Sequence, residues 1–600
     1  NLTGKAMIAE GLTGSSASVD MRDITFKSDG QGSVKTDTPT PPPVPQPVDT
    51  EDQIAELGAA GAAQAEKWKQ QNLRDDAANY TFAKGAALHA KASTSPYAID
   101  GTVGNILYKN KDGSIDMKGQ KLTLTSTADS DTKRAGGIHL VGGSLTVKNA
   151  GSVDISISGS KNAASAIYAE GSGGKAANLV IKNGDAPEHI VKIRNTASGD
   201  KAAAIMAKKN GAGARVTIEG LVDIEQEGAD LLHAEGGEIN IGGGSLIARG
   251  PNAKAVQISK GGKVYINAED DGDGVKAVSD TRDVKVEGNI VVGNVFNGGT
   301  FGAALATKDS YIRGLIGTAG YNANTRLFLG NGARWINESV GSGSDRLDES
   351  HLTHLKANNG AIFQKSNKNI TIDNFSGSVK LYYSHVNAGT ETEDYGTDKG
   401  HLDSSKFFGE THIKHAAPNS EITMVTDSNG ITMSDETQVR KALNALASKL
   451  YYEGAKDGEK NLKGKASIAE GLTSSSRTLS VADMDYWESN GRAYVKSTET
   501  NPLTEETVHK QIAESNFDAN ETKAYWKAKG VYDGKGNYTF RKNMKLITSA
   551  ADNPVISAKD NKFGTIYWNG DVDGSIDMTG HRLDIQAGPG GHGLLPGQGP

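Results

Sequence analysis

The sequence predicts an all-β fold built as a parallel β-helix, and three observations support this prediction. Between Gly136 and Gly293 a pattern of strand, glycine-rich turn and second strand recurs. Glycine, which suits tight corners between strands, accounts for 74 of the 600 residues. A period of roughly 20 to 40 residues with strands is typical of a solenoid, whose stacked coils share one core. The first strands carry apolar residues at comparable positions, 24 to 38 residues apart: Ile138, Ile167, Ile205, Leu232 and Val256.

The composition excludes several functional classes. The net charge of −7 is small for 600 residues and no basic stripe is visible, which argues against a nucleic-acid partner. The chain has no cysteine, which excludes disulfides, thiol nucleophiles and thiolate metal sites. No run of about 18 apolar residues occurs, so we expect no membrane-spanning helix.

Residues 1–128 form the first predicted module. Its first part is strand-like, and six of the fifteen prolines of the chain then fall between residues 39 and 47. Such a density of proline excludes sheet pairing and predicts a stiff, exposed loop. A helix is expected over about 50–71, with Thr50 as N-cap and Gln53 completing a capping box.

The β-solenoid is predicted to occupy residues 129–388, and the segment 389–460 to contain a polar loop, strands and an amphipathic helix. We place this helix over about 434–452, with Ser434 as its N-cap. Spacing of three and four residues puts its apolar side chains on one face. These side chains are Val439, Leu443, Leu446 and Leu450.

A long internal repeat is the second organising feature. The motif NLTGKAMIAEGLT at Asn1 returns as NLKGKASIAEGLT at Asn461, and Trp68 aligns with Trp526. We therefore expect a second copy of the module over 461–587, with a third helix over about 504–528. The glycine- and proline-rich residues 588–600 break the pattern and are expected to be a tail.

Several segments resemble a known family. The segments are NITIDNFSGSVKLYY, HIKHAAPNSEITM, LNALASKLYYEG and NLKGKASIAEGL. Together with the glycine-rich coils, they resemble the passenger regions of bacterial autotransporter adhesins (type V secretion), in particular a repeat in large autotransporter-like proteins of anaerobic diderm Firmicutes. The resemblance implies a right-handed parallel β-helix, secretion, and display at the cell surface through outer-membrane anchoring parts that lie outside this sequence.

The expected function is therefore non-enzymatic: adhesion, self-aggregation or surface structure. The expected partners are other copies of the chain or ligands on host or bacterial surfaces. One alternative is a β-helix polysaccharide lyase or glycoside hydrolase, which needs converging carboxylates in one groove. A phage tail-fibre-like structural protein is the second alternative. No catalytic residue and no organic cofactor is predicted.

One acidic stretch, EDDGDGVKAVSD, has the spacing of a calcium-binding loop. Glu269, Asp271, Asp273 and Asp280 fall at positions 1, 3, 5 and 12 of a twelve-residue loop. The flanking residues predict strands and not the helices of an EF-hand, so calcium is one interpretation and a solvated acidic turn is the other.

Two histidine pairs are the remaining candidates for metal ligands. His351 and His354 form one pair, and His412 and His415 form the other. A spacing of three residues on a strand directs the two side chains to opposite faces, which disfavours a shared zinc ion.

Overall fold

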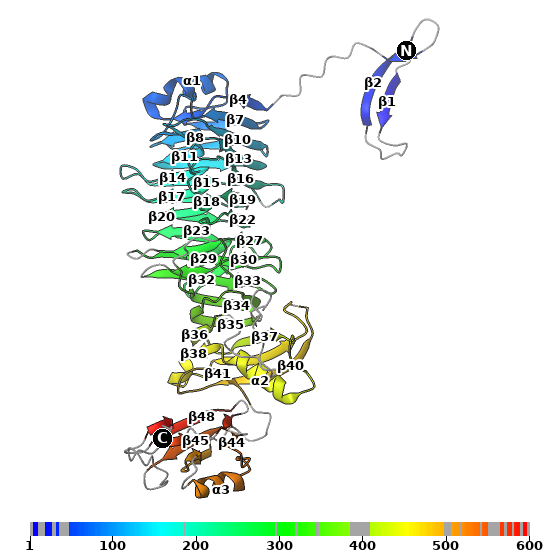
Figure 1. Ribbon diagram of the computed structural model, residues 1–600. Coiled ribbons are helices and arrows are strands. Elements are labelled where there is room, and N and C mark those ends of the chain that lie inside the picture. The colour runs from blue at the N-terminus through cyan, green and yellow to red at the C-terminus, as the bar shows by residue number, and fades with distance from the viewer. Residues whose placement is uncertain are drawn as a thin grey trace.

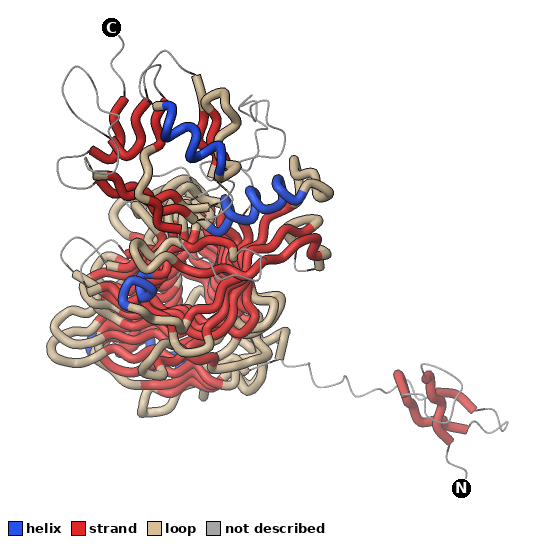
Figure 2. Tube along the Cα trace, turned by 90° about the horizontal axis from the view of Figure 1, so that it is seen from below, coloured by secondary structure: helices blue, strands red, loops and turns tan. Residues whose placement is uncertain are grey.

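The computed structural model confirms an all-β, parallel β-helical fold. It describes strands 4–9, 18–26 and 32–34 and the chain from residue 47 onward, with gaps. The gaps are 185, 294–296, 319–321, 342–346, 384–408, 474, 497–505, 515–518, 541–542, 550–563, 569–572, 579–580, 588–591 and 597–600. Coils stack in sequence order into an elongated column (Figure 1). Viewed along the column, the strands of successive coils overlie one another (Figure 2).

Each regular coil contributes one strand to each of three parallel ladders. The first ladder is a nine-stranded sheet. Its strands are β5 (Ile54–Glu56), β8 (Thr102–Lys109), β11 (Arg134–Val141), β14 (Ile167–Glu170), β17 (Ile205–Lys208), β20 (Leu232–Glu235), β23 (Lys254–Ser259), β28 (Asn289–Val292) and β31 (Ile316–Thr318).

The second ladder follows the first within each coil. Its strands are β6 (Asn79–Thr81), β9 (Gly113–Asp116), β12 (Gly143–Lys148), β15 (Ala177–Ile181), β18 (Ala214–Ile218), β21 (Glu238–Ile241), β24 (Lys263–Ile266), β29 (Gly299–Leu305) and β32 (Ala323–Leu329).

The third ladder completes the coil. Its strands are β4 (Val48–Thr50), β7 (Ala86–Lys91), β10 (Lys121–Ala128), β13 (Ser152–Gly159), β16 (Ile190–Asn195), β19 (Leu221–Glu227), β22 (Gly244–Arg249), β27 (Val284–Glu287), β30 (Tyr311–Arg313) and β33 (Arg334–Asn337).

Beyond β33 the two later ladders merge. The long strands β34 (Ser350–Gln364) and β35 (Ile370–Tyr383) run through both of them. They are followed by β36 (Thr411–Ala416), β37 (Ser420–Asp427) and β38 (Leu450–Tyr452).

The core is a set of in-register columns of apolar side chains. The five residues that the sequence placed at comparable positions do form one column: Ile138 pairs with Ile167, and the series continues through Ile205, Leu232 and Val256. All five side chains are fully buried. Burial of one such side chain stabilises the fold by about 2 kcal/mol, so the column is a main source of cohesion between coils.

Close stacking makes glycine necessary at some corners. Gly143 begins β12 with a φ of 101°. A Cβ atom at this position would overlap the carbonyl oxygen of Lys111 in the coil before it. Both the backbone conformation and the space therefore favour glycine there.

The first predicted helix starts later than expected. Helix α1 spans Ala62–Gln70 and follows a 3₁₀ turn. Thr50 ends strand β4, and Ile54 belongs to β5, which pairs with β8. The capping-box prediction is therefore wrong. The side chain of Gln53 instead points inward and donates to the carbonyl of Gly104 over 2.7 Å, because pairing with β8 buries this segment and satisfies its backbone.

The other two helices also occupy only part of their predicted ranges. Helix α2 spans Glu436–Ala447, and the last residues of the range 434–452 form β38. Its N-cap is Asp435 and not Ser434, since Asp435 Oδ1 accepts from the backbone N–H of Gln438 over 3.1 Å. Helix α3 spans Asn520–Ala528, after strands β42 (Glu506–Val508) and β43 (Ile512–Glu514).

In the described part of the chain, each copy of the repeat contains a three-stranded antiparallel sheet, which we call a hairpin. The first contains β1 (Gly4–Ala9), β2 (Ser18–Phe26) and β3 (Gly32–Val34) and forms a sheet of its own. The second contains β39 (Leu462–Ala469), β40 (Thr478–Tyr486) and β41 (Ala493–Val495) and extends the large sheet of the solenoid.

After the second hairpin a new solenoid begins. The expected 588–600 tail differs from the structure in one respect: β49 (His592–Pro596) pairs in parallel with β46 (Gly564–Trp568). The remaining strands are β44 (Asn537–Thr539), β45 (Met544–Thr548), β47 (Ser575–Asp577) and β48 (Leu583–Ala587). Most of the proline-rich loop 39–47 and the whole of the polar loop 389–405 lie outside the described residues.

Within the described part of the chain, no helix is long and apolar enough to cross a lipid bilayer.

Candidate functional site

The acidic stretch proposed for calcium forms a hairpin inserted between β24 and β27. Its strands are β25 (Ala268–Asp270) and β26 (Val275–Ala277). Glu269 pairs with Lys276 across the hairpin over 2.9 Å, and Asp271 pairs with Lys356 over 3.3 Å. Asp270, between them, pairs with Arg326 over 2.5 Å.

These ion pairs separate the predicted calcium ligands. Glu269 and Asp271 face cations that come from different strands, while Asp273 and Asp280 lie on opposite sides of β26 along the chain. In the described ranges, no three His, Asp or Glu side chains are placed to share a metal ion. The geometry therefore offers no support for calcium at this hairpin.

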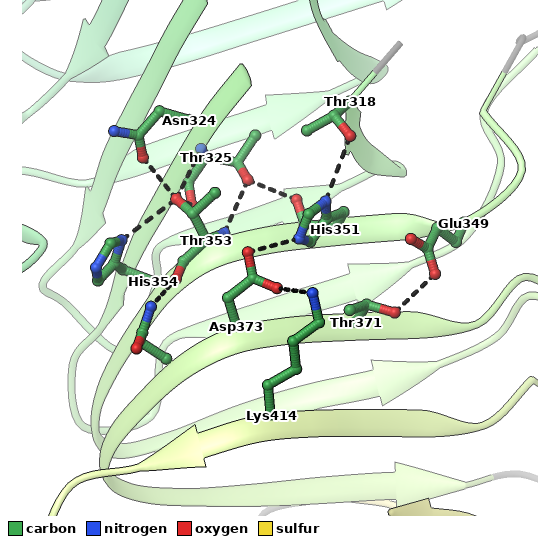
Figure 3. Close-up of polar contacts among 11 residues, drawn as sticks. Thr318, Asn324, Thr325, Glu349, His351, Thr353, His354, Thr371, Asp373 and Lys414 are labelled. Carbon is green, nitrogen blue, oxygen red and sulfur yellow. Dashed lines mark hydrogen bonds and ion pairs between the residues drawn. The ribbon is translucent and has the colours of Figure 1, made fainter. Parts of the chain in front are cut away.

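His351 belongs to a polar cluster centred on Asp373, formed by residues of β34, β35 and β36, and His354 lies beside it (Figure 3). Asp373 Oδ2 contacts His351 Nε2 at 2.9 Å, and Asp373 Oδ1 contacts Lys414 Nζ at 2.8 Å. His351 Nδ1 lies 3.4 Å from Thr318 Oγ1. His354 contacts Thr353 instead, and His412 pairs with Glu410, so neither histidine pair converges on one point.

The electrostatics of this cluster keep Asp373 ionised. Burial alone would raise the pKa of its carboxyl group, but hydrogen bonds from Lys414 and His351 hold it below its usual value. The carboxylate in turn raises the pKa of Lys414. Burial and the nearby Arg326 lower the pKa of His354.

The order Thr318, His351, Asp373 superficially matches the relay of a nucleophile, a base and an orienting carboxylate. Each of these residues, however, comes from a successive turn of the solenoid, and Lys414 adds the next. Asp373 also divides its two oxygens between two partners, His351 and Lys414. The arrangement is that of a polar ladder that ties four turns together.

The feature most distinctive of this chain is the end of the first solenoid. It is covered by the hairpin β39–β41, which we call the cap. Strand β39, from the second copy of the repeat, pairs in parallel with β37 over eight residues, from Ser420–Leu462 to Asp427–Ala469. Its other edge pairs antiparallel with β40. A strand of the second repeat thus covers the sheet edge that the first repeat would expose.

Helix α2 holds the cap in place. Its buried face packs against the hairpin, and Asn444 Oδ1 accepts from the backbone N–H of Val495 over 3.0 Å. Arg492 lies over the ring of Tyr451 at 4.2 Å and donates to the carbonyl of Ser448. The buried helix residues are Ala442, Leu443, Leu446 and Ala447.

The buried hydrophobic residues form two separate cores, and the boundary between these cores lies inside the second copy of the repeat. One continuous core runs from Ile54 to Ala493 and includes Ala466 and Ile468 of the cap. A separate core begins at Val508. Residues 461–587, expected as one module, therefore contribute a cap to the preceding solenoid and the first coils of the next.

A cavity of about 420 Å³ lies beside the cap. Its lining includes Glu421, Glu459, Lys465, Asp483 and Tyr486, which come from both the solenoid and the hairpin. Because its lining carries both acidic and basic side chains, it is a polar gap between the cap and the solenoid and not an apolar ligand pocket.

Neither the cap nor the Asp373 cluster was identified as a site from the sequence. The cap could have been found from the repeat, because the motif GKAxIA occurs in both β1 and β39. Asp373 and Lys414 belong to no motif, and only the stacking of β35 on β36 brings them together.

Comparison with protein-family models, with curated proteins and with solved structures finds no match for this chain.

Proposed function

We propose that this chain is a non-enzymatic structural protein, a β-solenoid stalk that acts in adhesion or self-association at a cell surface. The observation that carries the proposal is the cap: the solenoid of one repeat ends on β39, which belongs to the next. The hairpin of the second repeat is thereby joined to the solenoid of the first by a shared core and a hydrogen-bonded sheet. We expect this arrangement to link tandem units end to end, as a stalk requires.

The length added by each repeat supports this function. The third ladder and its continuation take thirteen strand-to-strand steps from β4 to β39. At about 4.8 Å for each step, one repeat extends the stalk by about 60 Å. Duplication of a unit then increases reach without any new fold.

The junction to the next unit is also built from side chains. Trp487, which directly follows β40, stacks on Tyr494 with ring centroids 3.9 Å apart. Arg582 of the next solenoid lies over the Trp487 ring at 4.7 Å. Such a cation–π contact contributes about 1 kcal/mol and gives the joint a preferred orientation.

Ion pairs between coils place opposite charges side by side on the outer surface. Examples are Arg194 with Asp223 at 2.7 Å and Arg215 with Glu238 at 3.1 Å. Exposed pairs of this type contribute less than about 1 kcal/mol each to stability. Their main effect is a surface of mixed charge, which permits many weak lateral contacts between stalks.

The resemblance to autotransporter passengers favours display at the outer surface of a diderm bacterium. The test is to fuse the chain to a surface anchor and to compare cells that carry the fusion with cells that carry the anchor alone. The proposal predicts aggregation or surface binding only with the fusion. Equal behaviour of the two strains, or depolymerisation of a polysaccharide by the purified chain, would contradict it.

A further inference from the structure

The two hairpins have the same backbone pairing but different surroundings. In the first, Gly4 pairs with Ile24 and the register shifts between Ile8 and Ala9. In the second, Gly464 pairs with Met484 and the register shifts at the equivalent place, between Ile468 and Ala469. Yet β39 lies between β37 and β40, whereas β1 is an edge strand of the sheet β1–β2–β3.

The sequences of the two edge strands also agree. Over residues 2–9 and 462–469 six of eight positions are identical. The identical positions include Ala6 and Ile8, which correspond to Ala466 and Ile468. In the docked strand both of these side chains are fully buried.

We propose that the hairpin β1–β3 docks through β1 on the β37 edge of a second copy of this chain. The expected register places Gly4, Ala6 and Ile8 opposite Ile422, Met424 and Thr426, as Gly464, Ala466 and Ile468 are placed now. This inference rests on the proposed function of a stalk built from capped units. It adds that the cap can be supplied by another molecule.

The occupant follows from complementarity that the chain already displays. Among the described residues, one edge of β1 pairs with no other strand, and such an edge can add to the edge of another sheet. The edge of β37 accepts a strand of this sequence and register. Because the hairpin precedes β4, which lies at one end of the column, and β37 lies toward the other end (Figure 1), docking between copies is head-to-tail and generates an open filament.

The test requires a chain whose own cap has been released. In the full chain, Ala466→Glu with Ile468→Glu places two carboxylates in a fully buried position and frees β37. The proposal predicts that the average mass by light scattering rises at least twofold with concentration, while the unchanged chain stays monomeric. Adding Ala6→Glu and Ile8→Glu, the matched changes in β1, is expected to restore the monomer.

Two outcomes of that experiment overturn the proposal: a cap-released chain that stays monomeric, or oligomers that persist after the changes in β1. A second variant covers the case in which the released chain fails to fold. Replacing residues 461–496 by residues 1–35 seats the first hairpin on β37 directly. Slow amide exchange at the grafted strand, within about tenfold of that of β39, is expected, and fast exchange there overturns the proposal.

These results are separable from the test of the proposed function. If β1 does not dock on β37 of another molecule, anchored cells still aggregate wherever lateral contacts between stalks are sufficient for aggregation. If β1 docks on β37 of another molecule but anchored cells do not aggregate, only the proposed adhesive role of the stalk is contradicted.

Discussion

The indole N–H of Trp68 donates a hydrogen bond to the carbonyl oxygen of Gln53 over 2.9 Å. Trp526 makes the same bond to Gln511 over 2.8 Å in the second repeat. Both tryptophans are buried under the first coil of their solenoid. The short helices α1 and α3 therefore close the beginning of each unit, as the hairpin closes its end.

Near this hydrogen bond, each copy of the repeat has a buried glutamate, and the cation that pairs with its carboxylate differs between the two copies. Glu56 accepts from Arg74 over 2.5 Å and from Tyr80 over 2.7 Å. In the second copy Glu514 accepts from Tyr538 over 2.9 Å, and its cation is Lys523 at 2.9 Å.

We predict that Arg74→Ala destabilises the first coil by about 3 kcal/mol, because it leaves the carboxylate of Glu56 buried without its cation. Ala65 and Arg74 align with Lys523 and Tyr532. Ala65→Lys with Arg74→Tyr should thus recover at least half of the loss. Amide exchange in β6 measures both effects, and a cost below about 1 kcal/mol for Arg74→Ala would show that the ion pair is unimportant.

His139 gives the solenoid a sensitivity to acid. It is buried in β11, contacts the carbonyl of Ser165 at 3.1 Å and stacks on Tyr168. Burial lowers the pKa of His139 to about 4. The unfolded chain, with a histidine pKa near 6.5, binds this proton more tightly than the folded chain does.

We therefore predict that stability falls as the pH decreases from about 6.5 to about 4, by about 3 kcal/mol in total, and is independent of this group above pH 7. His139→Gln should remove this part of the pH dependence. Thermal unfolding of both proteins between pH 4 and pH 7 is the measurement, and parallel curves would refute the assignment.

Asp373 contributes a pH dependence of the same sign at lower pH. Its lowered pKa means that the folded state favours the ionised carboxylate, so its contribution is present above the usual carboxyl pKa and is lost as the pH falls through the lowered value. Because a quarter of the side chain is exposed, we expect Asp373→Asn to cost only about 1 to 2 kcal/mol at pH 7.

Exchange of amides in β35 and β36 reports this loss directly. Lys414→Met serves as the control, since it removes one of the two partners of Asp373 and should cost less than Asp373→Asn. An equal effect of the two substitutions would mean that His351 contributes nothing to the ladder.

For the acidic hairpin we predict that calcium has little effect on stability. Lys276, Lys356 and Arg326 already neutralise three of its carboxylates. A site filled at 100 times its dissociation constant would add about 2.7 kcal/mol, which is readily visible as a higher melting temperature. A melting temperature unchanged by millimolar calcium is the expected result, and a rise of several degrees would restore the calcium interpretation.

The sequence predicted the column of Ile138 and Ile167 because a stacked core repeats its apolar residues at each coil. It misplaced the start of the first helix because Thr50 and Gln53, which match a capping box, also fit the end of β4 and the position before β5. Local pattern cannot decide between the two states when pairing with β8, about fifty residues later, determines the outcome.

The Asp373 cluster and the cap could not be predicted from the sequence, for a different reason. Lys414 meets Asp373 only through the register of β36 on β35, and that register depends on the lengths of the connections between them. The repeat itself was evident, but sequence identity marks where a repeat begins and not which core its residues join. Ala466 belongs to the second copy by sequence and to the first solenoid by burial.

The most direct test of capped, tandem units compares two strands within the same unmodified chain. Native-state amide exchange should show β39 protected to the level of β37, and β1 exchanging at least a hundredfold faster despite its matching hairpin. Equal protection of residues 4–9 and 462–469 at a concentration where the chain is monomeric would contradict the account.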